Sequence, residues 1–221
     1  NELIDRFHSF RFYLQTYLKK MPRILAFFGS ELLLAENPSI DNQEILNNYR
    51  DLGVIHILSI SGLHVGIYTL VVSAICFWLK LTEEETFLCC LFILLFGIFL
   101  SNGQAGFIRA SLSYVLGKLF KFKKWQVSRV DILGLTCLLH LLINPRLFMG
   151  VGAILSYVLA FGLQLTDKMT NLKRSIALNL FLTPLLLFYF FQFNLLTVAF
   201  NMLVVPYFNW IVMPITFVNL V

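Results

Sequence analysis

Two histidines and two serines lie within an otherwise apolar stretch, GVIHILSISGLHVGIY, at residues 53–68. Ser61 and His64 are three residues apart, so in a helix they are neighbours on its surface. A hydroxyl group beside a base is the arrangement that activates serine for nucleophilic attack. The pair therefore suggests an intramembrane hydrolase, although no acidic residue is recognisable as the partner that would orient the histidine. The simpler interpretation is that His56 and His64 are hydrogen-bonded core residues.

The spacing of the histidines and cysteines argues against a metal site. His56 and His64 are separated by about 12 Å of helical rise, which is more than one ion can bridge. The cysteines show no CxxC pair and no histidine at metal-ligand spacing; they are Cys76, Cys89, Cys90 and Cys137. We therefore expect packing cysteines, no metal and no cofactor in this chain.

A second polar cluster is NGQAGFIRAS at residues 102–111. Gly103 and Gly106 weaken a helix just before Arg109, which is flanked by apolar residues. An arginine at bilayer depth costs at least about 2.5 kcal/mol unless it is paired, hydrated or near the interface, and the apolar runs offer it no Asp or Glu. Arg109 thus predicts a water-filled path or an anionic ligand. A broken helix at 101–106 that binds a small anion would instead indicate a solute transporter.

Composition indicates the solvent in which these residues are positioned. The 221 residues are 58% hydrophobic, and the mean hydropathy is +0.79, far above soluble-domain values. Apolar runs suited to crossing a bilayer recur along the chain. We predict an all-α, polytopic membrane bundle with a transmembrane domain at 53–221 and about seven spanning helices, near 55–79, 87–101, 105–119, 131–143, 147–165, 175–192 and 195–213.

Residues 1–52 differ from the rest and are predicted to lead into the membrane domain. One helical stripe indicates an amphipathic helix that lies along the interface or packs on the bundle; it consists of Leu3, Phe7, Phe10, Leu14, Tyr17 and Met21. Residues 22–36 are too short and too charged to span. Asp41 and Glu44 predict the start of a short helix that ends at Gly53.

The distribution of charge predicts the orientation. The excess of Lys and Arg behind the net charge of +5 lies after residue 51, mainly at 118–129 and 168–174. These clusters are two passes apart, so both can be cytoplasmic. The acidic loop 83–85 then lies on the same side, and His56 lies near the outer surface. The break at 101–106 allows a re-entrant or discontinuous helix as an alternative.

Small residues and prolines predict where helices approach or bend. Ser59, Gly62, Gly66, Thr69 and Ser73 form one stripe with a GxxxG, a pattern typical of close helix packing. Prolines inside apolar runs shape or gate helices. The predicted packing and hinge set is Gly53, Gly62, Gly66, Gly103, Gly106, Pro184 and Pro206.

These motifs resemble a known family. HILSISGLHVGI followed by GQAGFIRA is similar to the characteristic motifs of the ComEC family of competence proteins. The resemblance continues through NPRLFMGVGAILSYVLAFG, TPLLLFYFFQF and NMLVVPYFNWIVMP, and so covers nearly everything after residue 26. It implies a multi-pass channel that brings single-stranded DNA across the bacterial cytoplasmic membrane during natural transformation.

The family also implies partners and further domains. These are a DNA receptor, a cytoplasmic motor or single-strand-binding proteins, and OB-like and metallo-β-lactamase-like domains of the full protein. The chain lacks an initiator Met and ends within an apolar run at Val221, so we expect it to be a fragment without enzymatic activity. The predicted path residues are His56, Ser61, His64, Arg109, Gln192 and Asn201.

Overall fold

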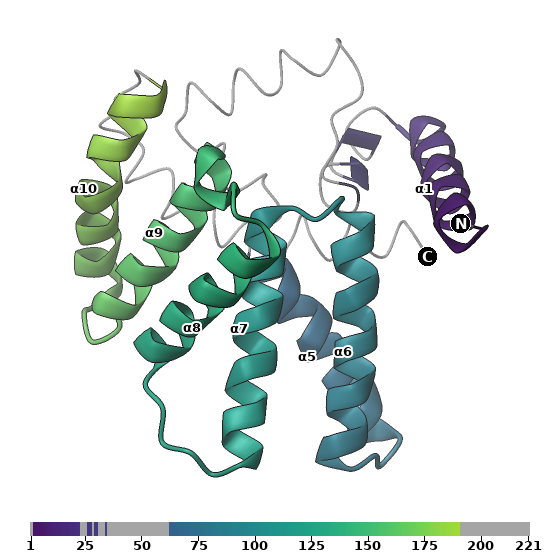
Figure 1. Ribbon diagram of the computed structural model, residues 1–221, viewed down its shortest axis with the longest axis horizontal. Helices are drawn as coiled ribbons and strands as arrows, with labels where there is room; N and C mark the ends of the chain where they lie inside the picture. Colours follow the sequence, from purple (N-terminus) through teal and green to yellow (C-terminus); the bar gives the residue numbers. More distant parts are fainter. Residues whose placement is uncertain (1, 23–25, 28, 31–33, 35–61, 191–221) are drawn as a thin grey trace. The chain divides into compact units, whose positions relative to one another are not determined.

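The structure is a computed structural model that describes residues 2–22, 26, 27, 29, 30, 34 and 62–190. In this part of the chain, every regular element is a helix, which confirms the all-α prediction (Figure 1). The helices are α1 (Glu2–Lys19), α5 (Gly62–Trp78), α6 (Glu83–Leu100), α7 (Ala105–Phe122), α8 (Arg129–Ile143), the short 3-10 helix η3 (Leu147–Met149), α9 (Val151–Leu165) and α10 (Asn171–Phe190).

The chain divides into two compact units, one of 1–60, 100–102 and 194–221, the other of 61–99 and 103–193. In the first unit, α1 buries Leu18 completely, and a Cβ atom at Gly29 would lie 2.8 Å from a Leu18 methyl group. Arg11 donates a hydrogen bond of 3.2 Å to the Leu34 carbonyl oxygen. The predicted division at residue 52 lies outside the described residues and stays a prediction.

Within the part of α1 whose side chains are described, burial centres on Leu18, beside the predicted apolar stripe. Leu18 is buried, whereas Phe10 and Tyr17 of the predicted stripe are exposed. Arg11 and Leu18 are seven residues apart and therefore share a face, and both contact residues of the 26–34 region. The buried face thus follows the contacts of Leu18, and the exposed aromatic residues Phe10 and Tyr17 lie about 80–100° away from it around the helix; the predicted interfacial role of the stripe stays a prediction.

In the second unit, α7 is the central helix. It contacts α5, α8 and α9, and α9 also packs against η3 and α10. Figure 1 shows α6 and α7 as an antiparallel pair joined by a short turn. The predicted spans at 87–101, 105–119, 131–143 and 175–192 correspond to α6, α7, α8 and α10. The predicted span at 147–165 is interrupted, because η3 and Gly150 precede α9.

Two helices of this unit begin at capping pairs. At the start of α6, the Thr82 N–H and hydroxyl groups donate to the Glu85 carboxylate at 2.8 and 2.9 Å, and the Glu85 N–H group donates to the Thr82 hydroxyl at 3.3 Å. At α8, the Ser128 hydroxyl accepts a bond from the Asp131 N–H group. The first N–H groups of a helix have no partner within the helix, and these side chains accept hydrogen bonds from them. Thr82 and Ser128 therefore determine where α6 and α8 begin.

The break at 101–106 is a tight turn between two helices. Asn102 and Gly103 have positive φ values of 52° and 68°, and the Gly103 N–H group bonds to the Ile98 carbonyl oxygen at 2.9 Å. This pattern closes a helix C-terminus and reverses the chain. The break therefore separates two helices and does not lie within one discontinuous helix, and Gly103 is a turn residue; the re-entrant alternative stays a prediction.

A glycine of α6 leaves room for an aromatic ring of α7, whereas the predicted packing role of Gly66 stays a prediction. A Cβ atom at Gly66 would meet nothing within 4 Å in the described part of the chain, so Gly66 makes no tight contact there. At Gly97 of α6, a Cβ atom would lie 2.5 Å from Cζ of Phe107 on α7. The ring of Phe107 needs this space because it is almost completely buried. The lack of a side chain at Gly97 therefore allows the Phe107 ring of α7 to pack against α6.

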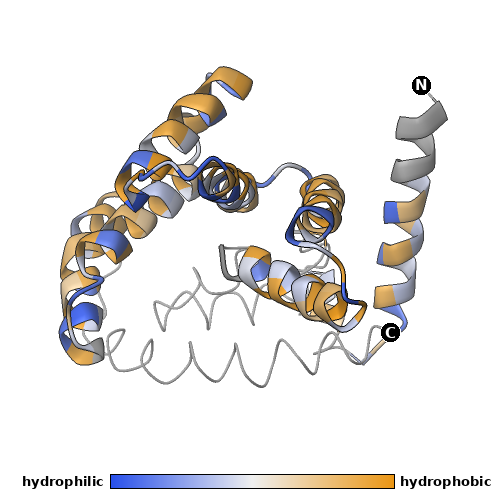
Figure 2. Cartoon of the chain, turned by 90° about the horizontal axis from the view of Figure 1, so that it is seen from below, coloured by the Kyte–Doolittle hydropathy of each residue, from blue (hydrophilic) through white to orange (hydrophobic). Residues whose placement is uncertain are grey.

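Hydrophobic residues predominate along the helices of the second unit (Figure 2). Among the described residues, one stretch of α10, Leu172–Tyr189, is long and apolar enough to cross a membrane by length and composition. Shorter apolar helical stretches are His64–Trp78 and Val151–Leu165. Pro184 lies inside α10, as predicted for a helix-shaping proline.

Candidate functional site

Arg109 lies in the second turn of α7 and is partly buried. Its Nε atom is buried and has no hydrogen-bond partner among the described residues. Arg109 is near enough to Tyr157 of α9 for the two side chains to interact electrostatically. The helix that carries Arg109 is held by Phe107, which is about 200° away around α7 and packs against Gly97 and Tyr68. Phe107 thus turns Arg109 away from α5 and α6.

A chain of buried hydrogen bonds crosses α7, α8 and α9 on the side of Arg109. The Tyr157 hydroxyl group lies 3.0 Å from Nδ1 of His140 and 3.5 Å from the Thr136 carbonyl oxygen. The hydroxyl groups of Thr136 and Ser113 share a bond of 3.1 Å. Ser113 is one turn after Arg109 on the same face of α7. Arg109 therefore lies on the same face of α7 as this network and interacts electrostatically with one of its members, Tyr157.

Burial makes this network important for the packing of the three helices. Thr136 and His140 are 0% and 1% exposed, and Tyr157 is 7% exposed. Buried polar groups cost free energy unless they are hydrogen-bonded, so they favour one arrangement of the helices. Phe148 of η3 packs edge-on against Tyr157 at 5.7 Å and holds the ring in place.

Sequence reasoning identified Arg109 but missed the rest of this network. The residues that it missed are Ser113, Thr136, His140 and Tyr157. A usable pattern was present, because Arg109 and Ser113, and likewise Thr136 and His140, are four residues apart in apolar helices and therefore share a face. Their meeting depends on the packing of three helices, which the spacing along one helix does not specify.

His64 has a different environment from Arg109. It is completely buried in the first turn of α5, on the helix that meets α7 through Tyr68 and Phe107 with ring centroids 6.0 Å apart. His64 is therefore part of the buried interior of the second unit, and its predicted role in the path stays a prediction. The partner predicted for it, Ser61, lies outside the described residues, as do His56, Gln192, Asn201, Gly53 and Pro206.

The cysteines lie at helix contacts and at the helix surface. Cys90 of α6 is buried, lies 3.7 Å from the Ser73 hydroxyl group and donates to the Thr69 carbonyl oxygen at 3.9 Å. Thr69 and Ser73 thus face α6, as members of the predicted small-residue stripe. Within the residues that the structure describes, no group of three His, Cys, Asp or Glu side chains is arranged to hold a metal ion.

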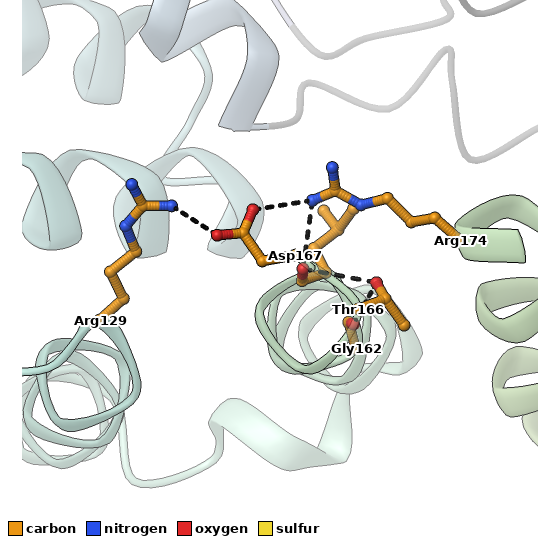
Figure 3. Close-up of polar contacts among 6 residues, drawn as sticks. Arg129, Gly162, Thr166, Asp167 and Arg174 are labelled. Atoms are coloured by element: carbon orange, nitrogen blue, oxygen red, sulfur yellow. Dashed lines mark hydrogen bonds and ion pairs between the residues drawn. The ribbon is translucent and has the colours of Figure 1, made fainter. Parts of the chain in front are cut away.

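Charged residues gather where α8 begins and where α9 turns into α10. Asp167 lies between two arginines, 3.4 Å from Arg129 and 3.7 Å from Arg174 (Figure 3). At another helix end, Lys121 of α7 lies 3.8 Å from Glu83 of α6. The predicted basic clusters at 118–129 and 168–174 and the acidic loop 83–85 thus share one end of the unit, as the counting of passes requires.

The comparisons with known proteins identify a family. The family model described as "Competence protein" matches residues 32–221. The chain is 33% identical over 183 residues to ComE operon protein 3 of Bacillus subtilis (strain 168). That match covers 77% of this chain and 23% of the relative, so the chain spans about a quarter of the relative's length. No solved structure matches. The chain belongs to the competence protein family.

Proposed function

We propose that this chain forms part of a multi-pass membrane channel that carries single-stranded DNA into the bacterial cytoplasm during natural transformation. The observation that supports the proposal is Arg109, which interacts electrostatically with Tyr157 of a polar network across α7, α8 and α9 in a member of the competence family. The hydrolase alternative rests on Ser61, which lies outside the described residues, and stays a prediction, as does the small-anion transporter.

The surface of the second unit supports a membrane location. Large apolar side chains are well exposed on several helices; they include Leu70, Phe77, Phe92, Leu138, Leu142 and Phe188. Soluble monomers rarely expose so many, because apolar surface is unfavourable in water. We infer that α5 to α10 cross or enter the bilayer, and that this surface faces lipid.

An arginine inside such a bundle suits DNA transport. Each nucleotide of a single strand carries one phosphate charge, so a path through the hydrocarbon needs water and cationic groups. Arg109 supplies a guanidinium group whose geometry matches phosphate oxygens. Its buried Nε atom lacks a hydrogen-bond partner within the described residues and is available to an anion. Arg109 therefore acts as a phosphate-binding residue of the path.

The charged end of the unit supports an orientation. Lys121, Arg129 and Arg174 lie at the same end as Glu83 and Asp167. Lys and Arg are enriched in cytoplasmic loops, so this end faces the cytoplasm. A strand that passes Arg109 then emerges among basic residues, where a motor or single-strand-binding protein would receive it. A DNA receptor delivers the strand from outside, and strand degradation belongs to other domains of the full-length protein.

The decisive experiment compares variants of Arg109 in the full-length protein in transformable cells. Arg109→Ala is expected to lower transformation frequency and uptake of labelled DNA by at least about tenfold, because a charge-assisted hydrogen bond contributes about 1.5–3 kcal/mol. Arg109→Lys keeps the charge and is expected to retain part of the uptake. The matched control is Arg146→Ala, since Arg146 is exposed in the turn between α8 and η3.

Immunoblots of the membrane fraction check that each variant is present in normal amount. If Arg109→Ala transforms as well as the Arg146→Ala control at equal abundance, Arg109 is not part of the path. If the Lys and Ala variants lose uptake equally, the guanidinium geometry and not the charge is required.

A further inference from the structure

An apolar groove of about 380 Å³ opens on the second unit between α8, η3, α9 and α10. Val130, Leu133, Gly134 and Cys137 line it from α8; the other lining residues are Phe148, Ile154, Tyr157, Val158, Phe161 and Phe181. The lining residues span about two turns of α8 and of α9, so the groove is roughly 10 Å long. Its volume is typical of sites for small ligands.

One end of this groove lies beside the charged bridge. Val130 of the lining directly follows Arg129 in the chain. Arg174 donates a hydrogen bond of 3.1 Å to the carbonyl oxygen of Leu163, two residues beyond Phe161 of the lining. Arg174 and Phe181 are seven residues apart on α10 and share a face. The arginines of Figure 3 therefore mark the mouth of the groove.

The mouth carries more positive than negative charge. Arg129 and Arg174 share the single carboxylate of Asp167, and neighbouring Lys168 and Lys173 add further positive charge. The Nε atom of Arg174 is buried and lacks a hydrogen-bond partner in the part of the chain that the structure describes. An anionic group at this position would gain both charge neutralisation and a donor.

We propose that the groove binds one anionic phospholipid, with an acyl chain along α8 and α9 and the phosphate group at Arg129 and Arg174. An apolar channel that ends in a basic mouth at the membrane surface has the two-part chemistry of such a lipid. The wholly apolar lining excludes a polar solute, and the charge of the mouth favours an anionic over a zwitterionic headgroup. This inference depends on the membrane location proposed above but not on DNA transport.

The first test fills the groove. A Cβ atom at Gly134 would meet nothing within 4 Å, so Gly134→Leu starts a side chain from open space in the groove lining, and leucine also favours the helix. Gly152→Leu on α9 is the matched control, because Gly152 is equally open and lies outside the lining. Native mass spectrometry of the full-length protein, titrated with phosphatidylglycerol, is expected to show about tenfold weaker binding for Gly134→Leu alone.

The second test uses the sign of the charge change. Arg129→Gln and Arg174→Gln are each expected to weaken phosphatidylglycerol binding about fivefold, with little effect on phosphatidylcholine of the same chain length. Asp167→Asn is expected to strengthen phosphatidylglycerol binding, because it leaves both arginines without their shared carboxylate. All three variants break the bridge, so a purely structural role would change binding in the same direction.

Specific results would overturn the proposal. Equal binding of the two lipids, or unchanged binding in Gly134→Leu, removes the lipid from the groove. A cysteine cross-link from Gly134→Cys to the 195–213 segment would assign the groove to the chain itself. A loss of dimer in Gly134→Leu without a change in lipid binding would assign it to a second copy. Weaker phosphatidylglycerol binding in Arg129→Gln and Arg174→Gln, together with stronger binding in Asp167→Asn, would support an anionic lipid in the groove.

Discussion

The Tyr157 hydroxyl group on α9 lies 3.0 Å from Nδ1 of His140 on α8, and both residues are almost completely buried. This hydrogen bond joins two helices that also pack against α7, where Arg109 resides. The position of Arg109 relative to its surroundings thus depends on a polar contact between two other helices. Loss of the Tyr157–His140 hydrogen bond is therefore expected to affect the packing of all three helices.

Tyr157→Phe is expected to destabilise the protein by about 1–3 kcal/mol, because it leaves the buried His140 nitrogen without its partner. Thermal unfolding of the purified full-length protein measures the loss. Tyr189→Phe is the control, since Tyr189 is exposed on α10. In a double-mutant cycle with His140→Leu, the two losses are expected to be less than additive. Strict additivity would contradict coupling between the residues.

Gly97→Ala is expected to destabilise the α6–α7 pair by about 1–3 kcal/mol, because the new methyl group overlaps the buried ring of Phe107. Gly66→Ala is the matched control and is expected to be neutral or stabilising, since its Cβ atom has open space and alanine favours a helix. Adding Phe107→Leu to Gly97→Ala is expected to recover part of the thermal stability. Equal effects of the two alanine variants would show that Gly97 is not a packing contact.

The N-terminus of α6 is expected to depend on pH through Glu85, which precedes the apolar part of the helix. The Thr82 N–H group, and then the Thr82 hydroxyl group, hold the pKa of Glu85 below its usual value. A lowered pKa means that the stabilisation is complete above about pH 4.3, the value for an unfolded chain, and is lost as the pH falls through the folded pKa.

Hydrogen exchange of the first turn of α6 between pH 6 and pH 3 measures this effect, after correction for intrinsic exchange. We expect faster exchange at low pH in the unchanged protein and a weaker pH dependence in Glu85→Gln. Glu84→Gln serves as the control because its carboxylate is not part of the capping pair. An identical pH dependence in all three proteins would contradict the capping role of Glu85.

The charged end of the second unit is expected to be accessible from the cytoplasm alone. Lys124→Cys and Lys168→Cys, in a background without other cysteines, should resist a membrane-impermeant thiol reagent in intact cells and react after lysis. Arg146→Cys, which lies in a connection at the other end of its helix, should react in intact cells. Labelling of all three positions from the same side would contradict the proposed multi-pass arrangement.

Much of the helical framework follows from local sequence patterns. The apolar runs at 87–101 and 131–143 predicted α6 and α8, because hydrophobic length is a local property of the sequence; the capping residues Thr82 and Ser128 at their starts were not predicted. The interruption before α9 was missed, since η3 owes its position to Phe148 packing on Tyr157. Local signals predict where helices form, but tertiary contacts decide where they break.

Some residues of the candidate site could be identified from the sequence alone, and others could not. Arg109 was identifiable because a charge in an apolar helix stands out in one dimension. His140 and Tyr157 are separated by 17 residues, and each alone resembles an ordinary core residue. Gly97 lies against an aromatic ring and Gly66 does not, and this difference likewise depends on which helix carries the ring. Such pairs of residues can be recognised only when the three-dimensional packing is known.

The pair formed by α6 and α7 has a consequence for biogenesis. Its outer ends meet at Glu83 and Lys121, and Gly103 reverses the chain between the two helices. Between Thr86 and Gly117 the sequence contains a single charge, Arg109, so a hairpin entering from the cytoplasm brings one cation across the hydrocarbon. Arginine opposes translocon insertion by at least about 2.5 kcal/mol at the centre of a helix. Arg109 lies in the second turn of α7, so its replacement is expected to ease insertion of this hairpin, and the amount of Arg109→Ala protein in the membrane fraction separates a defect of assembly from one of transport.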